Sequence, residues 1–330
     1  MSISTFWEES CSSFPQLMAV FLALGVLFVN GWTDAPNAIA SAVASRALTM
    51  NKAAVLATVM NILGGISSLY IGQKVAKTME QLSAFPPDRR GDLALLASLL
   101  TVVLWAVTAW YFGIPTSESH GLMAAVAGAS LALGAGGFSL PALFKVLAGL
   151  IFSVGAGFLG GWCFAALFRR QTRPRLWHRG QQIAAAMMAF AHGLQDTPKL
   201  AALLFLGSTA DQGNTPLWGL LLCSGMMGLG TLCAGERIIR KVGEEMVQIE
   251  EREGFAADLA GGLSLVLSTL QGMPVSTTHA KTCAMMGAAM SKRNGSIDPK
   301  VVSSMFWAWG LTFPLSAALG FLLTRLFLLF

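Results

Sequence analysis

Two aspartates stand inside otherwise apolar stretches of the chain, at matched positions of a repeated motif. The first motif reads Asn30-Gly-Trp-Thr-Asp34-Ala-Pro-Asn37, and the second reads His192-Gly-Leu-Gln-Asp196-Thr-Pro-Lys199. A carboxylate inside a lipid bilayer costs at least about 2.5–3.5 kcal/mol on insertion scales, so such a residue indicates a functional site. We therefore predict that Asp34 and Asp196 form a functional site that binds a cation.

The neighbouring polar residues of each motif are spaced to lie on the same helix face as the aspartate. Residues three and four positions apart share a face of a helix. Asn30 and His192 precede their aspartates by four residues, and Asn37 and Lys199 follow by three. We assign Asn30 and His192 to the cation site with Asp34 and Asp196, and Asn37 and Lys199 to substrate binding. A helix end, with Asp34 only capping the next helix, is the alternative interpretation.

A second repeated motif supplies hydroxyl groups beside predicted helix starts. It reads Gly113-Ile-Pro-Thr-Ser117-Glu-Ser-His120 in the first half and Gly272-Met-Pro-Val-Ser276-Thr-Thr-His279 in the second. A helix N-terminus offers free N–H groups and the positive end of a dipole, which suits an oxyanion. The predicted substrate-binding hydroxyls are those of Ser117, Ser119, Ser276, Thr277 and Thr278. Capping of the helices that start at Pro115 and Pro274 is the alternative role.

The histidines and the glutamate of these motifs are not expected to bind the substrate as the hydroxyl groups do. We expect His120 and His279 to orient the motif by hydrogen bonding rather than to bind a metal. Glu118 stands where the second half has Thr277. Because a carboxylate repels an anion unless it is protonated or paired, Glu118 either faces away or titrates. Lys281, three residues after Thr278, is a candidate partner for it.

The composition determines which elements must hold these residues. Of the 330 residues, 54% are hydrophobic and 12% are charged, and the mean hydropathy is +0.62. Soluble proteins carry about 25% charged residues, so the chain is predicted to be an all-α polytopic membrane protein. The apolar segments are 14–40, 53–73, 93–112, 118–135, 141–168, 183–207, 216–234, 256–271, 275–291 and 301–327. The shortest of them, including both that follow a Gly-x-Pro, are spans or re-entrant hairpins.

Matched motifs indicate an internal duplication. Asn30 pairs with His192, Gly72 with Gly235 and Gly113 with Gly272, at spacings of 162, 163 and 159 residues. We predict a first transmembrane repeat at 1–168, a basic cytoplasmic linker at 169–182, and a second repeat at 183–330. About five segments per half is an odd number, so the second repeat is inverted, with broken or re-entrant helices, and a binding site forms where the halves meet.

Loop charges predict the orientation. The segment 169–179 carries five arginines and is assigned to the cytoplasm by the positive-inside rule. Counting from there places 235–256 and 292–300 inside, 208–215 outside, and both termini outside. The loop 74–92 does not fit, because it is assigned outside although it contains Lys74, Lys77, Arg89 and Arg90.

Other function classes receive less support. Ser276 and His279 lie three apart without a nucleophile elbow, and an enzyme would not need two inverted copies of a site, so we predict no enzyme activity. The five cysteines show no metal-ligand spacing, and we expect no metal or other cofactor beyond the coupling cation. The basic residues lie in connecting segments, which is typical of membrane topology rather than of nucleic-acid binding. A channel built from the same helix ends remains an alternative.

The motifs resemble those of the inorganic phosphate transporter (PiT) family of secondary carriers. That family is marked by a duplicated Gly-x-Asn-Asp-x-x-Asn-Ala element and a duplicated Gly-x-Pro-x-Ser-Thr-Thr-His element. They correspond here to 31–38 and 193–200, and to 113–120 and 272–279. The resemblance covers nearly the whole chain. It implies an alternating-access symporter of phosphate, a homodimer, and phosphate and ion sites formed by Asp34, Asn37, Asp196 and the hydroxyl groups.

The chain also departs from the family pattern. The residue before each aspartate is Thr33 or Gln195, and Lys199 replaces the second asparagine. The resemblance to bacterial members with this lysine favours proton coupling, because a tethered ammonium can replace a sodium ion, and sodium remains the alternative. Sulfate, another tetrahedral oxyanion, is the alternative substrate. The length resembles that of short bacterial forms, which implies the bacterial cytoplasmic (inner) membrane.

Overall fold

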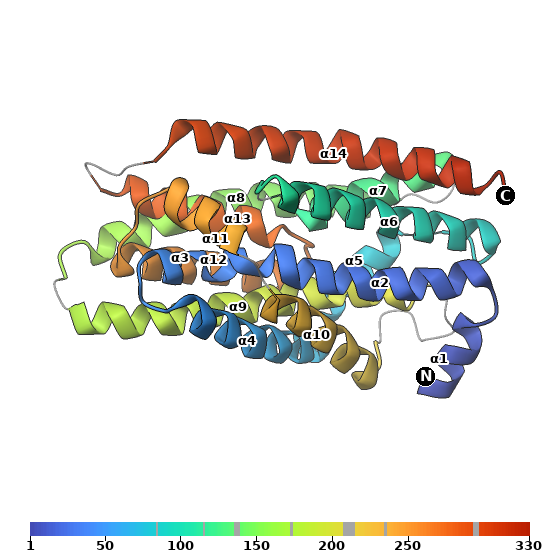
Figure 1. Cartoon of the computed structure of the whole chain (residues 1–330), viewed down its shortest axis with the longest axis horizontal. Coiled ribbons are helices and arrows are strands. Elements are labelled where there is room, and N and C mark those ends of the chain that lie inside the picture. Colours follow the sequence, from blue (N-terminus) through green and yellow to red (C-terminus); the bar gives the residue numbers. More distant parts are fainter. Residues whose placement is uncertain are drawn as a thin grey trace.

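The computed structural model describes residues 1–83, 85–114, 116–134, 139–171, 174–206, 215–233, 236–292 and 297–330. Within these ranges the chain forms an elongated bundle of helices (Figure 1). The helices are α1 (Ile3–Ser10), α2 (Phe14–Thr33), α3 (Ala35–Ala44), α4 (Met50–Ile71), α5 (Gln73–Leu82), α6 (Arg89–Tyr111), α7 (Glu118–Leu133), α8 (Leu140–Phe168), α9 (Pro174–Leu204), α10 (Leu217–Leu232), α11 (Glu236–Arg240), the π-helical turn η1 (Lys241–Glu245), α12 (Glu251–Leu270), α13 (Thr277–Met290) and α14 (Pro299–Phe327).

The predicted membrane class is confirmed by the lengths of the helices. Five stretches of the described chain are long and apolar enough to cross a bilayer: α2 with α3, α4, α6, α8 and α14. Large apolar side chains such as Ile151, Leu322 and Trp307 are exposed on them, where lipid can cover them. Every apolar segment predicted from the sequence coincides with a helix. The chain is therefore an all-helical, multi-pass membrane protein.

Helices of the first half pack against helices of the second half in two matching sets of pairs. α2 packs on α10 and α9 packs on α4, while α7 packs on α14 and α13 on α8. Gly31 and Gly193, at matched motif positions, lie at the first two crossings. A Cβ at Gly31 would be 2.0 Å from the Met227 carbonyl oxygen, and one at Gly193 would be 2.1 Å from that of Asn61. The glycine of each motif thus permits close helix approach.

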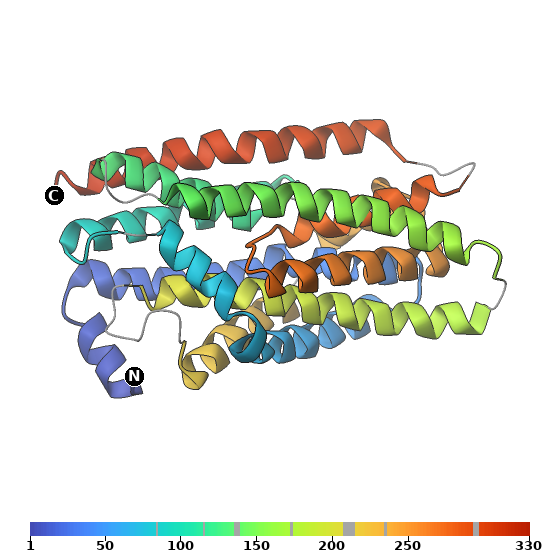
Figure 2. The same cartoon turned by 180° about the vertical axis from the view of Figure 1, so that it is seen from behind.

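The direction of the helices agrees with the predicted inversion. Both termini lie at one end of the bundle, and the end of α8 and the start of α9 lie at the other (Figures 1 and 2). α2 starts at the end that holds the termini, and α9 starts at the opposite end (Figure 1). α2 and α9, which carry the two aspartate motifs, therefore run in opposite directions. The inversion itself, and its orientation in a membrane, remain predictions.

Two connecting segments differ from the sequence-based expectation. α8 ends at Phe168 and α9 begins at Pro174, so the second half of the predicted linker 169–182 is helical. Proline suits the first position of a helix, because its missing N–H would be unpaired there. Arg175 and Arg179 therefore belong to α9, and residues 172 and 173 lie outside the described residues. Part of the loop 74–92 forms the amphipathic helix α5, with Lys74 and Lys77 exposed.

The two aspartate motifs have different backbones. In the first half the helix is interrupted at Asp34, between α2 and α3. In the second half α9 runs without a break through Asp196 to Leu204, although Pro198 lies inside it. The broken helices expected in the repeats are thus found at the first aspartate motif and not at the second. The short helices α7 and α13 follow Gly113 and Gly272, whose φ angles of 65° and 67° are left-handed in both halves. Pro115 lies outside the described residues.

Candidate functional site

Asp34 lies at the break between α2 and α3 and accepts three hydrogen bonds. The side chain of Asn37 donates to Oδ1 at 3.0 Å, and the hydroxyl of Thr277 donates to Oδ2 at 3.0 Å. The hydroxyl of Thr278 also contacts Oδ1. Asp34 occupies the N-cap position of α3, but its side chain caps no N–H of that helix. The interpretation of Asp34 as a helix cap is therefore wrong for its side chain, which is free to face the centre of the bundle.

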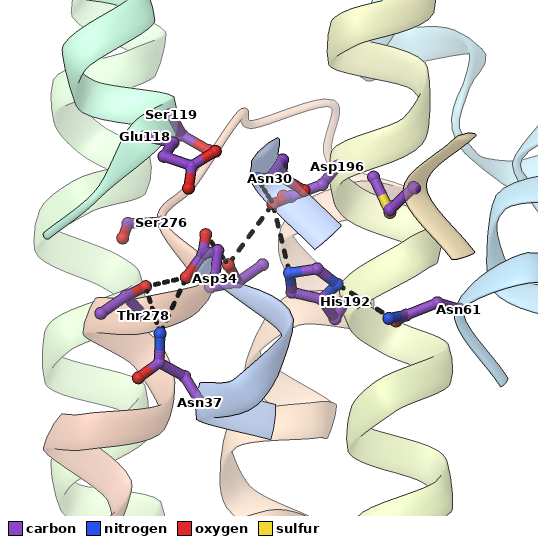
Figure 3. A network of polar contacts seen from close by, with 12 residues as sticks. Asn30, Asp34, Asn37, Asn61, Glu118, Ser119, His192, Asp196, Ser276 and Thr278 are labelled. Atoms are coloured by element: carbon purple, nitrogen blue, oxygen red, sulfur yellow. Dashed lines mark hydrogen bonds and ion pairs between the residues drawn. The ribbon is translucent and has the colours of Figure 1, made fainter. Parts of the chain in front are cut away.

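Asp196 lies on α9 and is paired with a fixed cation. The Lys199 ammonium lies 2.6 Å from Asp196 Oδ1. Asn30 donates to Oδ2 at 3.2 Å, and His192 Nε2 lies 3.6 Å from the same oxygen (Figure 3). These four side chains are all buried. Asp196 and Lys199 are three residues apart, so their side chains lie on the same face of α9 about one turn apart. This spacing positions the ion pair.

Lys199 also reaches both of the short helices. Its ammonium donates to the hydroxyl of Ser119 at 2.8 Å and to the carbonyl oxygen of Val275 at 2.7 Å. Ser119 is on α7, and Val275 immediately precedes α13. Thr277 lies between the two aspartates, since its hydroxyl is also 3.5 Å from Asp196 Oδ2. One lysine thus connects the second aspartate motif with the hydroxyl motifs of both halves.

Two of the predicted hydroxyl ligands serve as helix caps. Ser117 Oγ accepts a hydrogen bond from the backbone N–H of His120 at 3.2 Å, and Ser276 Oγ accepts from that of His279 at 3.1 Å. This is the N-cap geometry, which satisfies an N–H that has no partner within the helix. Each hydroxyl keeps its hydrogen for another acceptor. Capping and anion binding are therefore compatible at Ser117 and Ser276.

His120 and His279 do not orient their motifs by hydrogen bonds. All four of their ring nitrogens are buried without a hydrogen-bond partner. Instead the two rings lie against each other, with centroids 4.5 Å apart. Phe313 packs on His120 and Trp309 on His279, at centroid distances of 4.9 and 3.8 Å. The matched histidines join the starts of α7 and α13 through ring packing against α14.

Lys281 does not partner Glu118, contrary to expectation. Its ammonium forms an ion pair with Asp258 and lies 2.6 Å from the hydroxyl of Ser41. Gln181 donates to Asp258 at 2.7 Å, and all four side chains are buried. This cluster connects α3, α9, α12 and α13, the helices around the aspartates. The misassignment arose because Asp258 is distant in sequence and belongs to an apolar segment.

Two further polar residues near the site were not predicted from the sequence. Asn61 Oδ1 lies 3.1 Å from His192 Nδ1, and Asn61 donates to the hydroxyl of Thr231 at 3.0 Å. Thr33, next to Asp34, contacts the carboxyl of Glu118. Asn61 is fully buried in an apolar segment, and that isolation was a usable signal. Thr33 gave no such signal, since its partner is distant in the sequence.

The predicted site residues converge on one region (Figure 3). A cavity of about 10 Å³ lies there, lined by Val26, Asn30, Val102, Glu118, Ser119, Leu122, Asp196, Lys199 and Leu200. Such a volume holds about one water molecule. Among the described residues, Asp34, His192 and Asp196 each place one ligand atom within 4.8 Å of the others and could approach a cation together. Their roles in binding remain predictions.

The chain is similar in sequence to known proteins over most of its length. The model of the phosphate transporter family matches residues 30–175 and 169–320. A protein of Bacillus subtilis (strain 168) described as a probable low-affinity inorganic phosphate transporter is 30% identical over 317 residues, which cover 92% of this chain and 94% of that protein. One of Rhizobium meliloti (strain 1021) with the same description is 31% identical over 326 residues, covering 94% and 96%.

A solved structure shares the fold. It is titled "The sodium-dependent phosphate transporter", and it superposes with a TM-score of 0.84 over 95% of this chain and 98% of that one. The sequence identity is 19%, so this similarity is evidence for the arrangement of helices alone.

Proposed function

The chain belongs to the phosphate transporter family, and on that premise we propose that it is a symporter that carries inorganic phosphate together with protons. Phosphate would bind at the convergence of the two aspartate motifs and the two hydroxyl motifs, between the halves of the chain. The observation that carries this proposal is the shared set of hydrogen-bond donors around Asp34.

The groups that donate to Asp34 can donate either to its carboxylate or to a bound phosphate, but a hydrogen used for one is not available to the other. Asn37, Thr277 and Thr278 all donate to Asp34, and each is also a predicted ligand of phosphate. A hydroxyl has one hydrogen to donate. When a cation neutralises Asp34, its demand for donors falls, and the donors become available to phosphate oxygens. Binding of the cation and of the anion is thereby linked, which is the requirement for symport.

The same site favours phosphate over sulfate. Buried acceptor atoms include the carboxylates of Asp34 and Asp196 and the side-chain oxygens of Asn30 and Asn37, and these two amide oxygens have no partner. Phosphate near neutral pH carries P–OH groups that can donate to such acceptors, whereas sulfate has no hydrogen to donate. An acceptor left unpaired in a buried site costs about 1–3 kcal/mol. Sulfate is therefore the weaker ligand.

Lys199 supports the proton as the coupling ion. Its ammonium is 2.6 Å from Asp196 and already supplies the positive charge that a metal ion would supply there. The name of the structural neighbour refers to sodium, but this chain has its own cation at one of the two aspartates. A proton on the remaining carboxyl groups then completes the charge balance without a metal ion.

A carrier mechanism is supported by the size of the cavity. Its volume of about 10 Å³ holds about one water molecule, so phosphate cannot enter unless the surrounding helices move. Rocking of one half against the other around a central site is the motion that repeat-built transporters use. An open channel would need a continuous wet path instead.

Uptake of labelled phosphate into proteoliposomes tests the proposal. We expect accumulation when the outside is made acidic, little response to an inward sodium gradient, and competition by arsenate rather than by sulfate. Asp34→Asn and Asp196→Asn should abolish gradient-driven uptake while the protein remains monodisperse in detergent. Uptake that changes with neither the pH gradient nor the sodium gradient would contradict symport. Competition by sulfate but not by arsenate would contradict the assignment of phosphate as the substrate.

A further inference from the structure

Glu118 is a third carboxyl group in the site, and the duplicated motif does not account for it. The matched residue in the second half is Thr277. Glu118 is the first residue of α7, its exposed fraction is 4%, and it lines the central cavity together with Asp196 and Lys199. Figure 3 shows its carboxyl directed toward the space beside Asp34 and Asp196. It therefore neither faces away nor pairs with Lys281.

The hydrogen bonds of the three carboxyl groups are unequal. Asp34 receives three donors, and Asp196 is held by an ammonium and an amide. Glu118 Oε2 is buried without a hydrogen-bond partner, and Oε1 contacts the hydroxyl of Thr33. The Asn30 side chain also interacts with Glu118, but it is shared with Asp196. A buried carboxylate with few donors is costly. Donors thus support the charged form less at Glu118 than at the two aspartates.

The Thr33 hydroxyl lies against two oxygens and can donate to only one of them. Thr33 Oγ1 lies 2.9 Å from the carbonyl oxygen of Val29, one turn back in α2, and also contacts Glu118 Oε1. A hydroxyl has one hydrogen but accepts as well. If Thr33 donates to Val29, then the second contact is satisfied only when Glu118 is protonated and donates to Thr33. Both contacts are satisfied together in that form.

The charges around Glu118 also favour its protonated form. With all three carboxyl groups ionised and only Lys199 positive, the cluster would carry two net negative charges before any anion entered. The charged groups facing Glu118 are Asp34 from the α2–α3 junction, and Asp196 and Lys199 from α9. On the helices packed against α7, the charged residues lie toward the helix ends or on exposed surface: Arg89, Arg90, Asp92, Lys74, Lys77, Glu80, Lys300 and Arg325.

We propose that Glu118 carries a coupling proton, and that the protonated carboxyl, which donates its hydrogen to Thr33, has no charge to repel the bound phosphate. This inference rests on the proposed function and adds a proton site to it. One proton from the outer solution binds the Glu118 carboxylate when phosphate enters, and the same proton returns to solution on the inner side when phosphate leaves. No bond other than that O–H forms or breaks.

The position of Glu118 also permits release of the proton. The first turn of a helix stabilises a nearby negative charge, so the N-terminus of α7 supports the Glu118 carboxylate once phosphate has left. While phosphate is bound, the anion competes for that same N-terminus, and the protonated form is favoured. The occupancy of the phosphate site would thus determine whether Glu118 holds its proton, which is what coupling requires.

The experiment compares wild type with Glu118→Gln in proteoliposomes, because glutamine keeps a hydrogen-bond donor but cannot lose a proton. Glu244→Gln, an exposed residue of η1, is the matched control. Two quantities are measured for each protein: exchange of labelled for unlabelled phosphate without a gradient, and steady-state accumulation under an imposed pH gradient. Each coupled proton multiplies the limiting accumulation by about ten per pH unit of gradient.

We expect Glu118→Gln to retain exchange, to lose the decline of exchange that wild type shows at high pH, and to accumulate about tenfold less phosphate per pH unit. Accumulation equal to wild type would overturn the assignment of the proton to Glu118. So would loss of exchange, since the isostere of the protonated form should still bind phosphate. Failure of the proposed function looks different, because wild type itself would then show no exchange or no response to the pH gradient.

Discussion

Replacing Lys199 by asparagine tests whether the lysine stands in for a metal cation. Asparagine is the residue at the matched position of the first half, Asn37. The substitution removes the ammonium that lies 2.6 Å from Asp196, 2.8 Å from Ser119 and 2.7 Å from the Val275 carbonyl oxygen. Asp196 then remains as a buried carboxylate with Asn30 as its nearest donor.

The expected size of the effect follows from these contacts. Removing one partner of a buried ion pair destabilises a protein by about 3–5 kcal/mol. A cation that binds in place of the ammonium restores stability in proportion to its occupancy, by about 2.7 kcal/mol at a concentration one hundred times its Kd. We therefore expect Lys199→Asn to be strongly destabilised in choline chloride, and largely restored in sodium chloride.

The assay is thermal unfolding of the purified protein in detergent, in matched concentrations of sodium and choline chloride, followed by phosphate uptake in the same two salts. Lys52→Asn, an exposed lysine at the start of α4, is the control and should unfold like wild type in both salts. Uptake by Lys199→Asn should become dependent on sodium. A variant as stable as wild type in choline, or one that sodium does not stabilise more than wild type, would refute the reasoning.

Further predictions concern the scaffold of the site. Lys281→Met should lower the free energy of unfolding by about 3–5 kcal/mol by leaving Asp258 unpaired, and the double variant with Asp258→Leu should recover most of the loss; equal stability of the single and double variants in chemical denaturation would contradict this pairing. Gly193→Ala should reduce the yield of folded protein, because its Cβ would lie 2.1 Å from the Asn61 carbonyl oxygen, whereas Gly225→Ala has no atom within 4 Å and should behave as wild type in size-exclusion chromatography. Ser276→Ala should cost about 1 kcal/mol through loss of the N-cap of α13, and a loss below the error of the unfolding measurement would argue against the cap.

The sequence was sufficient to predict the helices and most of the polar residues that lie together at their centre. The apolar segments are long and have clear ends, so each matched a helix. The duplication then selected Asp34, Asp196 and the hydroxyl motifs, because a polar residue kept at matched positions of an apolar chain stands out. The structure brings these residues together, with Lys199 in contact with Asp196 and with both hydroxyl motifs.

The partners of the charged residues could not be predicted in the same way. Spacing along a helix identifies partners three or four residues apart, such as Lys199 and Asp196. Lys281 and Asp258 are on different helices, and their contact depends on how α12 and α13 pack. The contact between Thr33 and Glu118 is a second example, since it joins α2 to α7. Pairing between helices is a property of tertiary packing, which motif spacing does not encode.

The central claim is that phosphate and protons cross together through this one buried site. The direct measurement is internal pH in proteoliposomes that start with no gradient of pH or of membrane potential. We predict that adding phosphate outside acidifies the interior in wild type, whereas Asp34→Asn gives no acidification and sulfate gives none in either protein. Entry of labelled phosphate without any change in internal pH would contradict the account.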